Sequence, residues 1–281
     1  MTKTALITGA SSGFGLLTTV ALARRGWRVL ATMRDPSRRG LLDDAARAAG
    51  VVERIEVHAL DVTKADEIGA MAELIEKRPS QLNALINNAG FAAPGFAEDV
   101  TDAELREQFE TNFFGAAAMT RAILPRMRRQ GCGHIVMISS VSGRSGFAGV
   151  SNYAASKFAL EGWTETLRFE LRALGIQVVL VEPGSFETDI WTRNARISAG
   201  MRDANAANAA RVSRWREQLE RSNKRGDPQI VADRIVSILE KPNPKLRYVV
   251  GRDAHLLFWL RALLPWSVFE RMVVKLSGMD G

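Results

Sequence analysis

The sequence predicts an α/β fold, in which helices cover both faces of a parallel sheet. Short apolar runs alternate with longer amphipathic stretches along the chain, and a glycine-rich segment directly follows the first apolar run. Parallel strands need a crossover between them, usually a helix, and this requirement produces the alternation. A chain of 281 residues is long enough to bury a full core of this kind.

Seven segments are expected as strands and six as helices. The strands are 4–8, 28–32, 53–59, 83–87, 134–139, 177–182 and 246–250, and the helices are about 14–25, 37–49, 64–77, 102–129, 152–174 and 228–240. Right-handed crossovers then favour a doubly wound, Rossmann-type sheet of seven parallel strands. We expect a single domain, because no linker rich in Pro, Gly or Ser and no internal repeat divides the chain.

Composition excludes several classes of function. The single cysteine, Cys132, cannot form a disulfide within the chain, and three scattered histidines make a metal site unexpected. The net charge of +7 has no accompanying stripe of basic and aromatic residues, so we expect no nucleic-acid partner. The chain enters an apolar strand directly after Met1-Thr2 and contains no uninterrupted run of roughly 18–20 apolar residues. These features predict a cytoplasmic protein.

The first strand leads into "TGASSGFG", residues 8–15, in which the glycines are Gly9, Gly13 and Gly15. Glycines let a backbone turn tightly and approach a pyrophosphate that rests at a helix N-terminus. Ser11 and Ser12 add hydroxyl donors, and Phe14 completes the loop. A plain tight turn is the alternative interpretation, but the position between a strand and a helix favours a dinucleotide site.

Three motifs together resemble the signature of the short-chain dehydrogenases/reductases. They are TG-x-x-x-G-x-G at the N-terminus, "NNAG" at 87–90 and Y-x-x-x-K at 153–157, and the resemblance covers roughly residues 3–190. It implies an NAD(P)-dependent enzyme that acts on CH–OH groups, with a dinucleotide-binding domain over 1–251. It also implies cofactor contacts by Asn88, Ala89 and Gly90.

Tyr153 and Lys157 are four residues apart and share one face of a helix. A nearby ammonium lowers the pKa of a tyrosine, which can then exchange a proton with a substrate. The resemblance implies that Lys157 also holds the nicotinamide ribose. It assigns the catalytic serine to Ser140 rather than to Ser139, because Ser140 lies thirteen residues before the tyrosine. It implies that Asn112 completes the set by holding a water; a packing asparagine is the alternative.

The end of the second strand indicates which dinucleotide is bound. Where family members that use NAD carry an acid, this chain has Met33, followed by Arg34, whose forked guanidinium suits a 2′-phosphate. We therefore expect NADP(H) to be preferred, with NAD(H) as the alternative. Asp61 resembles the family's adenine-binding aspartate, with the Val62 backbone beside it, although a helix cap is a compatible interpretation. After strand six, the resemblance implies nicotinamide contacts by Pro183, Gly184, Phe186 and Thr188.

The substrate pocket is expected beyond the catalytic residues, under a lid formed by about 188–226. Its candidate lining residues are Ser142, Phe147, Phe91, Phe96 and Trp191. They are mostly apolar, which predicts an apolar or aromatic alcohol or ketone. "VLATMRDP" and "VEPGSFETD" resemble the steroid- and retinol-dehydrogenase branch of the family.

Residues 252–281 form an apolar, helical C-terminal extension. Within it, 254–276 is rich in aromatic and aliphatic residues but is interrupted by charges and by Pro265. We expect two short helices that cap the substrate site or pack against another subunit, since the family is usually dimeric or tetrameric. Peripheral contact with a membrane surface is the alternative.

The leading hypothesis is an NADP(H)-dependent oxidoreductase that transfers hydride between nicotinamide and the carbonyl or secondary alcohol of a lipophilic small molecule. Two other classes compete with it: a catalytically silent nucleotide-binding sensor or scaffold, and a membrane-associated binding module. The presence of all four catalytic residues disfavours the silent protein.

Overall fold

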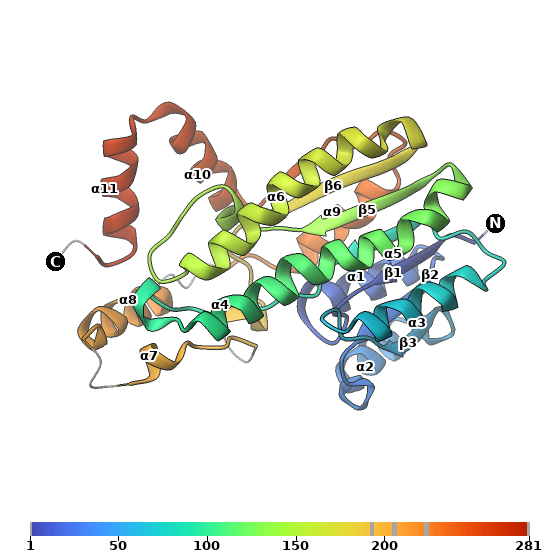
Figure 1. Cartoon of the computed structure of the whole chain (residues 1–281), viewed down its shortest axis with the longest axis horizontal. Coiled ribbons are helices and arrows are strands. Elements are labelled where there is room, and N and C mark those ends of the chain that lie inside the picture. The colour runs from blue at the N-terminus through green and yellow to red at the C-terminus, as the bar shows by residue number, and fades with distance from the viewer. Residues whose placement is uncertain (1, 192–193, 204–206, 222–224, 280–281) are drawn as a thin grey trace.

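The computed structural model describes residues 2–191, 194–203, 207–221 and 225–279, and it contains one seven-stranded, fully parallel sheet with the strand order β3-β2-β1-β4-β5-β6-β7 (Figure 1). The strands are β1 Thr4–Ile7, β2 Arg28–Met33, β3 Ile55–Ala59, β4 Ala84–Asn87, β5 Gly133–Ile138, β6 Ile176–Pro183 and β7 Arg247–Val250. This arrangement confirms the predicted doubly wound, Rossmann-type fold.

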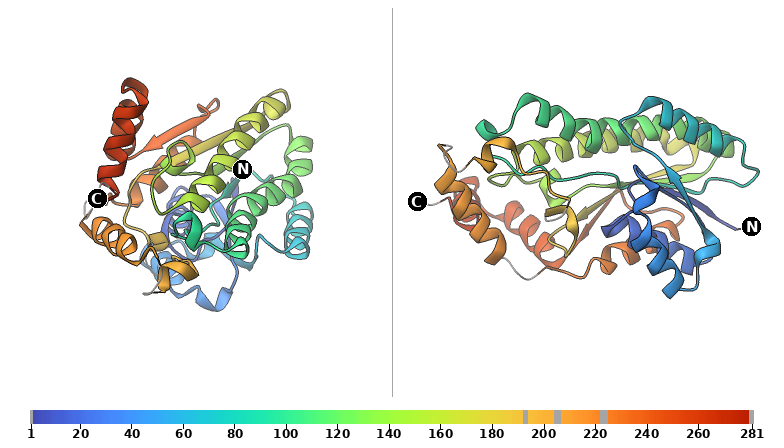
Figure 2. Two further views of the ribbon diagram at one scale, coloured as in Figure 1. Left: turned by 60° about the vertical axis from the view of Figure 1, so that its left-hand side comes forward. Right: turned by 90° about the horizontal axis from the view of Figure 1, so that it is seen from below.

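Helices cover both faces of the sheet, as the view from below in Figure 2 shows. The principal helices are α1 Gly13–Arg24, α2 Gly40–Ala48, α3 Ala65–Glu76, α5 Gly115–Gln130, α6 Ser151–Leu171 and α9 Gln229–Leu239. Two separate apolar clusters result, one under α1, α2 and α9 and the other under α3, α5 and α6. Because both faces are covered, the strands are apolar almost throughout, which is why their sequences predict them well.

The long helix expected over 102–129 is interrupted. Helix α4, Asp102–Phe109, begins with a capping box between Thr101 and Glu104, and a π-helical turn, Glu110–Phe114, separates it from α5. A π turn widens the helix by one residue and often marks a functional position. Here it contains Asn112. The apolar periodicity of the sequence continues across this turn and gives no sign of it.

Two groups of helices lie beyond the carboxyl end of the sheet. The segment after β6 contains α7, Ala199–Arg202, and α8, Ala209–Arg221. Helices α10, Arg252–Leu263, and α11, Trp266–Leu276, form a hairpin that projects away from the sheet (Figure 1). Within the described ranges, no helix combines the length and apolar character needed to cross a bilayer.

Candidate active site

Most of the predicted cofactor and catalytic residues meet around one cavity of about 100 Å³ at the carboxyl end of the sheet. It lies beyond the neighbouring strands β1 and β4, where the strand order reverses, the place at which doubly wound sheets bind ligands. Predicted residues that line it are Ser12, Gly13, Phe14, Asn88, Gly90, Ser140, Tyr153, Lys157, Pro183, Gly184, Phe186 and Thr188. The topology thus brings together segments that are far apart in the sequence.

The glycine-rich loop has the geometry of an anion cradle. Gly9 and Gly13 have φ values of 71° and 55°, and a Cβ atom at Gly15 would lie 2.2 Å from the Gly9 carbonyl oxygen. The Asn88 amide donates to the Thr8 and Gly9 carbonyls and fixes this loop against the one after β4. The α1 N-terminus has no side-chain cap, so its first N–H groups are free to bind a pyrophosphate. These features fit a dinucleotide.

Tyr153 is 3% exposed, and the hydroxyl that lies beside its phenol is that of Ser140. The Ser139 side chain faces Glu161 instead. Burial raises the pKa of Tyr153 to about 12, and the neighbouring Ser140 hydroxyl opposes this rise only in part. The sequence predicted a lowered pKa, and the structure of the protein alone does not show it. The phenol is therefore protonated at neutral pH and is ready to donate.

The position of Lys157 explains why the pKa of Tyr153 is not lowered as the sequence predicted. Its Nζ lies 5.8 Å from the centroid of the Tyr153 ring and donates to the Ile138 carbonyl at 2.8 Å. Burial lowers the pKa of Lys157 to about 8, while the Glu161 carboxylate one turn further along α6 raises it. Lys157 thus lies in the cavity beside the tyrosine without contacting its hydroxyl.

A buried network of charges lies behind Lys157. The Arg247 guanidinium, on β7, is 3.1 Å from Glu161 and 3.2 Å from Glu182, and Arg144 contacts Glu182 at 2.9 Å. Burial raises the pKa of Glu161 to about 7, and the neighbouring Glu182 acts in the same direction. Removing one partner from such a network leaves a buried charge without compensation. The network joins α6, β6 and β7 directly behind the active lysine.

The Asn112 side chain, 1% exposed, holds the segment that follows "NNAG". Its Oδ1 accepts from the Phe91 N–H at 3.1 Å, and its Nδ2 donates to the Phe91 carbonyl at 3.0 Å and to Ser156 Oγ at 3.3 Å. Its amide is therefore used for positioning this segment against α6. The water predicted beside Asn112 stays a prediction.

Arg34 lies exposed at the carboxyl end of β2, followed by Asp35, which caps a 3₁₀ turn. Asp61 Oδ1 accepts from the N–H and hydroxyl of Thr63, so it closes a turn, and its second oxygen has no such partner. Arg196 lies close to Arg34 and to Asp61. Burial and the charge of Arg34 lower the pKa of Arg196, whereas the Asp61 carboxylate raises it. Sequence reasoning missed Arg196, which comes from the distant segment after β6.

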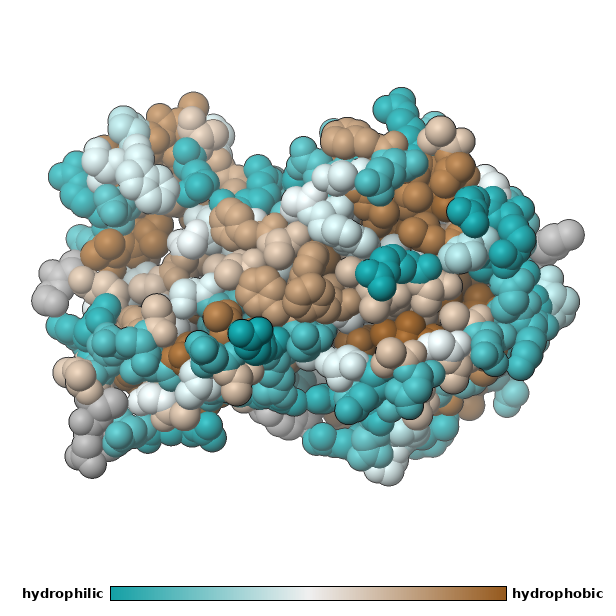
Figure 3. All heavy atoms as spheres, in the orientation of Figure 1, coloured by the Kyte–Doolittle hydropathy of each residue, from teal (hydrophilic) through white to brown (hydrophobic). Residues whose placement is uncertain are grey.

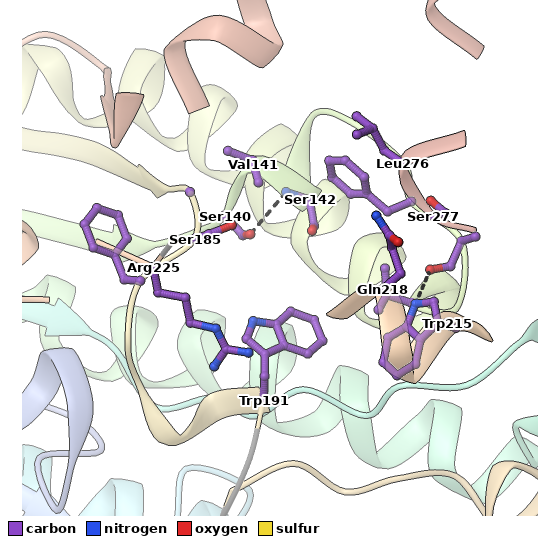
Figure 4. Close-up of a pocket in the computed structure, with 15 residues that line it drawn as sticks. Ser140, Val141, Ser142, Ser185, Trp191, Trp215, Gln218, Arg225, Leu276 and Ser277 are labelled. Atoms are coloured by element: carbon purple, nitrogen blue, oxygen red, sulfur yellow. Dashed lines mark hydrogen bonds between the residues drawn. The ribbon is translucent and has the colours of Figure 1, made fainter. Parts of the chain in front are cut away.

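A second cavity, of about 240 Å³, adjoins the first and shares Ser140, Gly184, Phe186 and Trp191 with it (Figure 4). The predicted residues Ser142, Phe147 and Trp191 line it, and the Trp191 ring lies edge-on to Tyr153 at 5.3 Å between centroids. Residues that were not singled out from the sequence also line it, namely Trp215, Gln218 and Arg225 from the expected lid segment and Leu276 and Ser277 from the C-terminal extension.

Two predicted substrate residues lie elsewhere. Phe91 packs beneath the Arg196 guanidinium, whose Cζ is 4.5 Å from the ring centroid, and Phe96 packs against Met201 and Val212. Neither lines either cavity. The prediction placed them by nearness to "NNAG" in sequence, but helices α7 and α8 cover Phe96. Ser11, Ala89 and Val62 lie in the surrounding loops and do not line the two cavities.

A buried tyrosine next to a serine hydroxyl, beside a lysine and a glycine-rich cradle, defines the site of a dinucleotide-dependent oxidoreductase. Comparisons with known proteins support this class. The family "short chain dehydrogenase" matches residues 3–197. An uncharacterized oxidoreductase, YusZ, of Bacillus subtilis is 40% identical over 97% of this chain and 98% of its own length. Human retinol dehydrogenase 8 is 34% identical to this chain over 87% of this chain and 80% of its own length.

Among solved structures, a metagenomic short-chain oxidoreductase in complex with NADP is 26% identical, with a TM-score of 0.69 and coverage of 88% of this chain and 96% of that one. The chain therefore belongs to the short-chain dehydrogenase family, and it is a nicotinamide-dependent oxidoreductase.

Proposed function

We propose that this protein is an NADP(H)-dependent reductase or dehydrogenase that interconverts a carbonyl and a secondary alcohol on a lipophilic small molecule. The observation that supports it best is the pairing of Ser140 and Tyr153 on the wall of the first cavity, with Ser140 also lining the second. Residues of the cofactor cradle lie on one side of this pair, and a partly apolar cavity lies on the other.

Each residue around the first cavity has a separate role in the proposed reaction. When bound in the cradle, the cofactor supplies or accepts hydride. Tyr153, which is protonated at neutral pH, donates a proton to the carbonyl oxygen in the direction of reduction. The Ser140 hydroxyl stabilises charge that develops on the same oxygen. Lys157 orients the nicotinamide ribose, and Asn112 holds the Phe91 backbone in place.

The preference for NADP(H) over NAD(H) is supported by two guanidinium groups. Arg34 and Arg196 lie near one another by Asp61, where the resemblance places the adenosine end of the cofactor. A doubly charged 2′-phosphate is stabilised by such a pair, since charge-assisted hydrogen bonds are about twice as strong as neutral ones. The metagenomic relative contains NADP.

A lipophilic substrate is supported by Phe147, Val150, Trp191, Trp215 and Leu276, which line the second cavity. One relative, retinol dehydrogenase 8, is named for an apolar alcohol. We propose the segment around α7 and α8 as the lid, because Trp191 and Trp215 reach the cavity from it. An NADPH-oxidation screen over ketones, aldehydes, steroids and retinoids tests the proposal, and a carbonyl-dependent rate is expected.

Homo-oligomerisation is proposed from the face formed by α5 and α6. Figure 3 shows apolar residues gathered over these helices, and Phe114, Phe158 and Phe169 are 50%, 45% and 70% exposed. Large exposed apolar patches commonly mark interfaces.

Peripheral membrane contact is a separate proposal, which is compatible with the enzyme activity and with a cytoplasmic location. On the α10–α11 hairpin, Trp259, Leu263 and Trp266 are 61%, 61% and 62% exposed. We expect the full chain to float with anionic liposomes and a chain ending at residue 251 not to float. A chain with Trp259→Ser and Trp266→Ser tests the same surface without truncation. Equal flotation of all three proteins would exclude this contact.

A further inference from the structure

Arg225 is the only charged residue among the described residues that line the second cavity. In Figure 4 its side chain extends from beside Ser185 toward the indole of Trp191. In the part of the chain that the structure describes, it has no hydrogen bond or ion pair. Arg144 and Arg247, behind Lys157, and Arg196 each contact a carboxylate. Arg225 therefore differs from its neighbours in having no counter-charge.

The backbone beside Arg225 is anchored to the active site. The Gly226 N–H donates to the Ser185 carbonyl at 2.9 Å, and the Glu187 N–H donates to the Gly226 carbonyl at 2.9 Å. These bonds form a short parallel bridge between Phe186 and Gly226. The residue before Gly226 is thereby held next to the loop that follows β6.

Arg225 is half-buried, and a guanidinium that loses part of its hydration without gaining an anion is electrostatically unfavourable. The polar residues that share the cavity, such as Ser142, Gln218 and Ser277, are neutral. No described residue that lines this cavity has a carboxylate that could turn toward Arg225. A ligand can supply the missing charge, and a forked guanidinium recognises carboxylate and phosphate oxygens best.

We infer that Arg225 binds an oxyanion carried by the substrate itself. This inference rests on the proposed function and makes its substrate class narrower: an oxo acid, or the corresponding hydroxy acid, with an apolar body. The reacting carbonyl lies at Ser140 and Tyr153, and the anionic group lies at Arg225. Trp191 lines the same cavity, with its ring 5.3 Å from that of Tyr153, and the Arg225 side chain extends toward its indole. The apolar body of the substrate is therefore expected to pack against Trp191.

The test is calorimetric titration of the enzyme saturated with NADP⁺, using hexanoate, hexanamide and hexyl phosphate. We expect hexanoate to bind about tenfold or more tightly than hexanamide, because only the acid pairs with the guanidinium. Arg225→Gln should abolish this difference, and Arg225→Lys should retain part of it. Arg214→Gln, at an exposed position on α8 outside the cavity, removes the same charge and should leave the difference intact.

Equal binding of hexanoate and hexanamide, or a difference that survives Arg225→Gln, would overturn the inference. Tighter binding of hexyl phosphate than of hexanoate supports it and identifies a phosphorylated substrate. Failure of the proposed function has a different signature: the unaltered enzyme then gives no heat with NADP⁺ and no NADPH oxidation with any carbonyl. An enzyme that binds NADP⁺ but does not distinguish the acid from the amide contradicts only the role of Arg225.

Discussion

Replacing Tyr153 with Phe should lower kcat/KM for NADPH-dependent carbonyl reduction by about 10²–10⁴-fold, the usual contribution of a general acid. The phenyl ring keeps the packing against Trp191 and removes only the hydroxyl that Ser140 contacts. Burial raises the pKa of Tyr153 to about 12, so this hydroxyl carries its proton at neutral pH. NADPH affinity, measured by fluorescence titration, should change by no more than a few fold.

Tyr248→Phe is the matched control, since Tyr248 is the only other tyrosine in the chain. Its hydroxyl accepts from the Lys245 N–H at the surface and lines neither cavity. The control should turn over at the rate of the unaltered enzyme. Undiminished turnover by Tyr153→Phe would remove the tyrosine from the mechanism, whereas loss of NADPH binding would indicate a structural role.

Replacing Arg34 with Asp should lower the ratio of kcat/KM for NADPH to that for NADH by about 10²-fold or more. The substitution removes a charge-assisted contact with the 2′-phosphate and places a repulsive carboxylate there. The same carboxylate can accept hydrogen bonds from the ribose hydroxyls of NADH. Kinetics with both cofactors at a saturating concentration of one carbonyl compound measure the change.

Arg38→Asp distinguishes a local contact from a general effect of charge. Arg38 is exposed four residues further along the chain, and its replacement changes the net charge by the same amount. We expect it to alter the cofactor ratio much less than Arg34→Asp does. If the ratio is unchanged by Arg34→Asp, or equally changed by both substitutions, Arg34 does not bind the phosphate.

The fold could be predicted closely because both faces of the sheet are buried. The observed β2, β4 and β7 differ from their predicted bounds by one residue at most. Among the strands, the largest error is at β3, where 53–54 lie in a 3₁₀ turn rather than in the strand. Apolar runs in the sequence indicate which segments are buried, but they do not indicate the local hydrogen-bond pattern at the ends of those segments.

The candidate site was predictable where the residues lie in one contiguous motif. Tyr153, Lys157 and the glycine-rich loop are examples, and their spacing reflects a helix and a tight turn. Arg196 and Arg225 were not predictable, because their positions depend on how the segment after β6 folds back onto the sheet.

The pKa of Tyr153 could not be read from the sequence for a related reason. Its spacing from Lys157 suggests an interaction between charges, but burial by Trp191 and the surrounding core dominates in the structure. Such desolvation is a property of the tertiary fold, which the local sequence does not encode.

The most direct test of hydride transfer uses NADPH labelled with deuterium at C4, prepared separately in each of its two stereochemical forms. Each form is incubated with the carbonyl compound that is reduced fastest in the screen, and the product is examined by mass spectrometry and NMR. We predict one deuterium on the carbinol carbon from one of the two labels and none from the other, with one NADPH consumed per alcohol formed. Oxidation of NADPH that is independent of the carbonyl, or an alcohol free of deuterium from both labels, would contradict the proposed function.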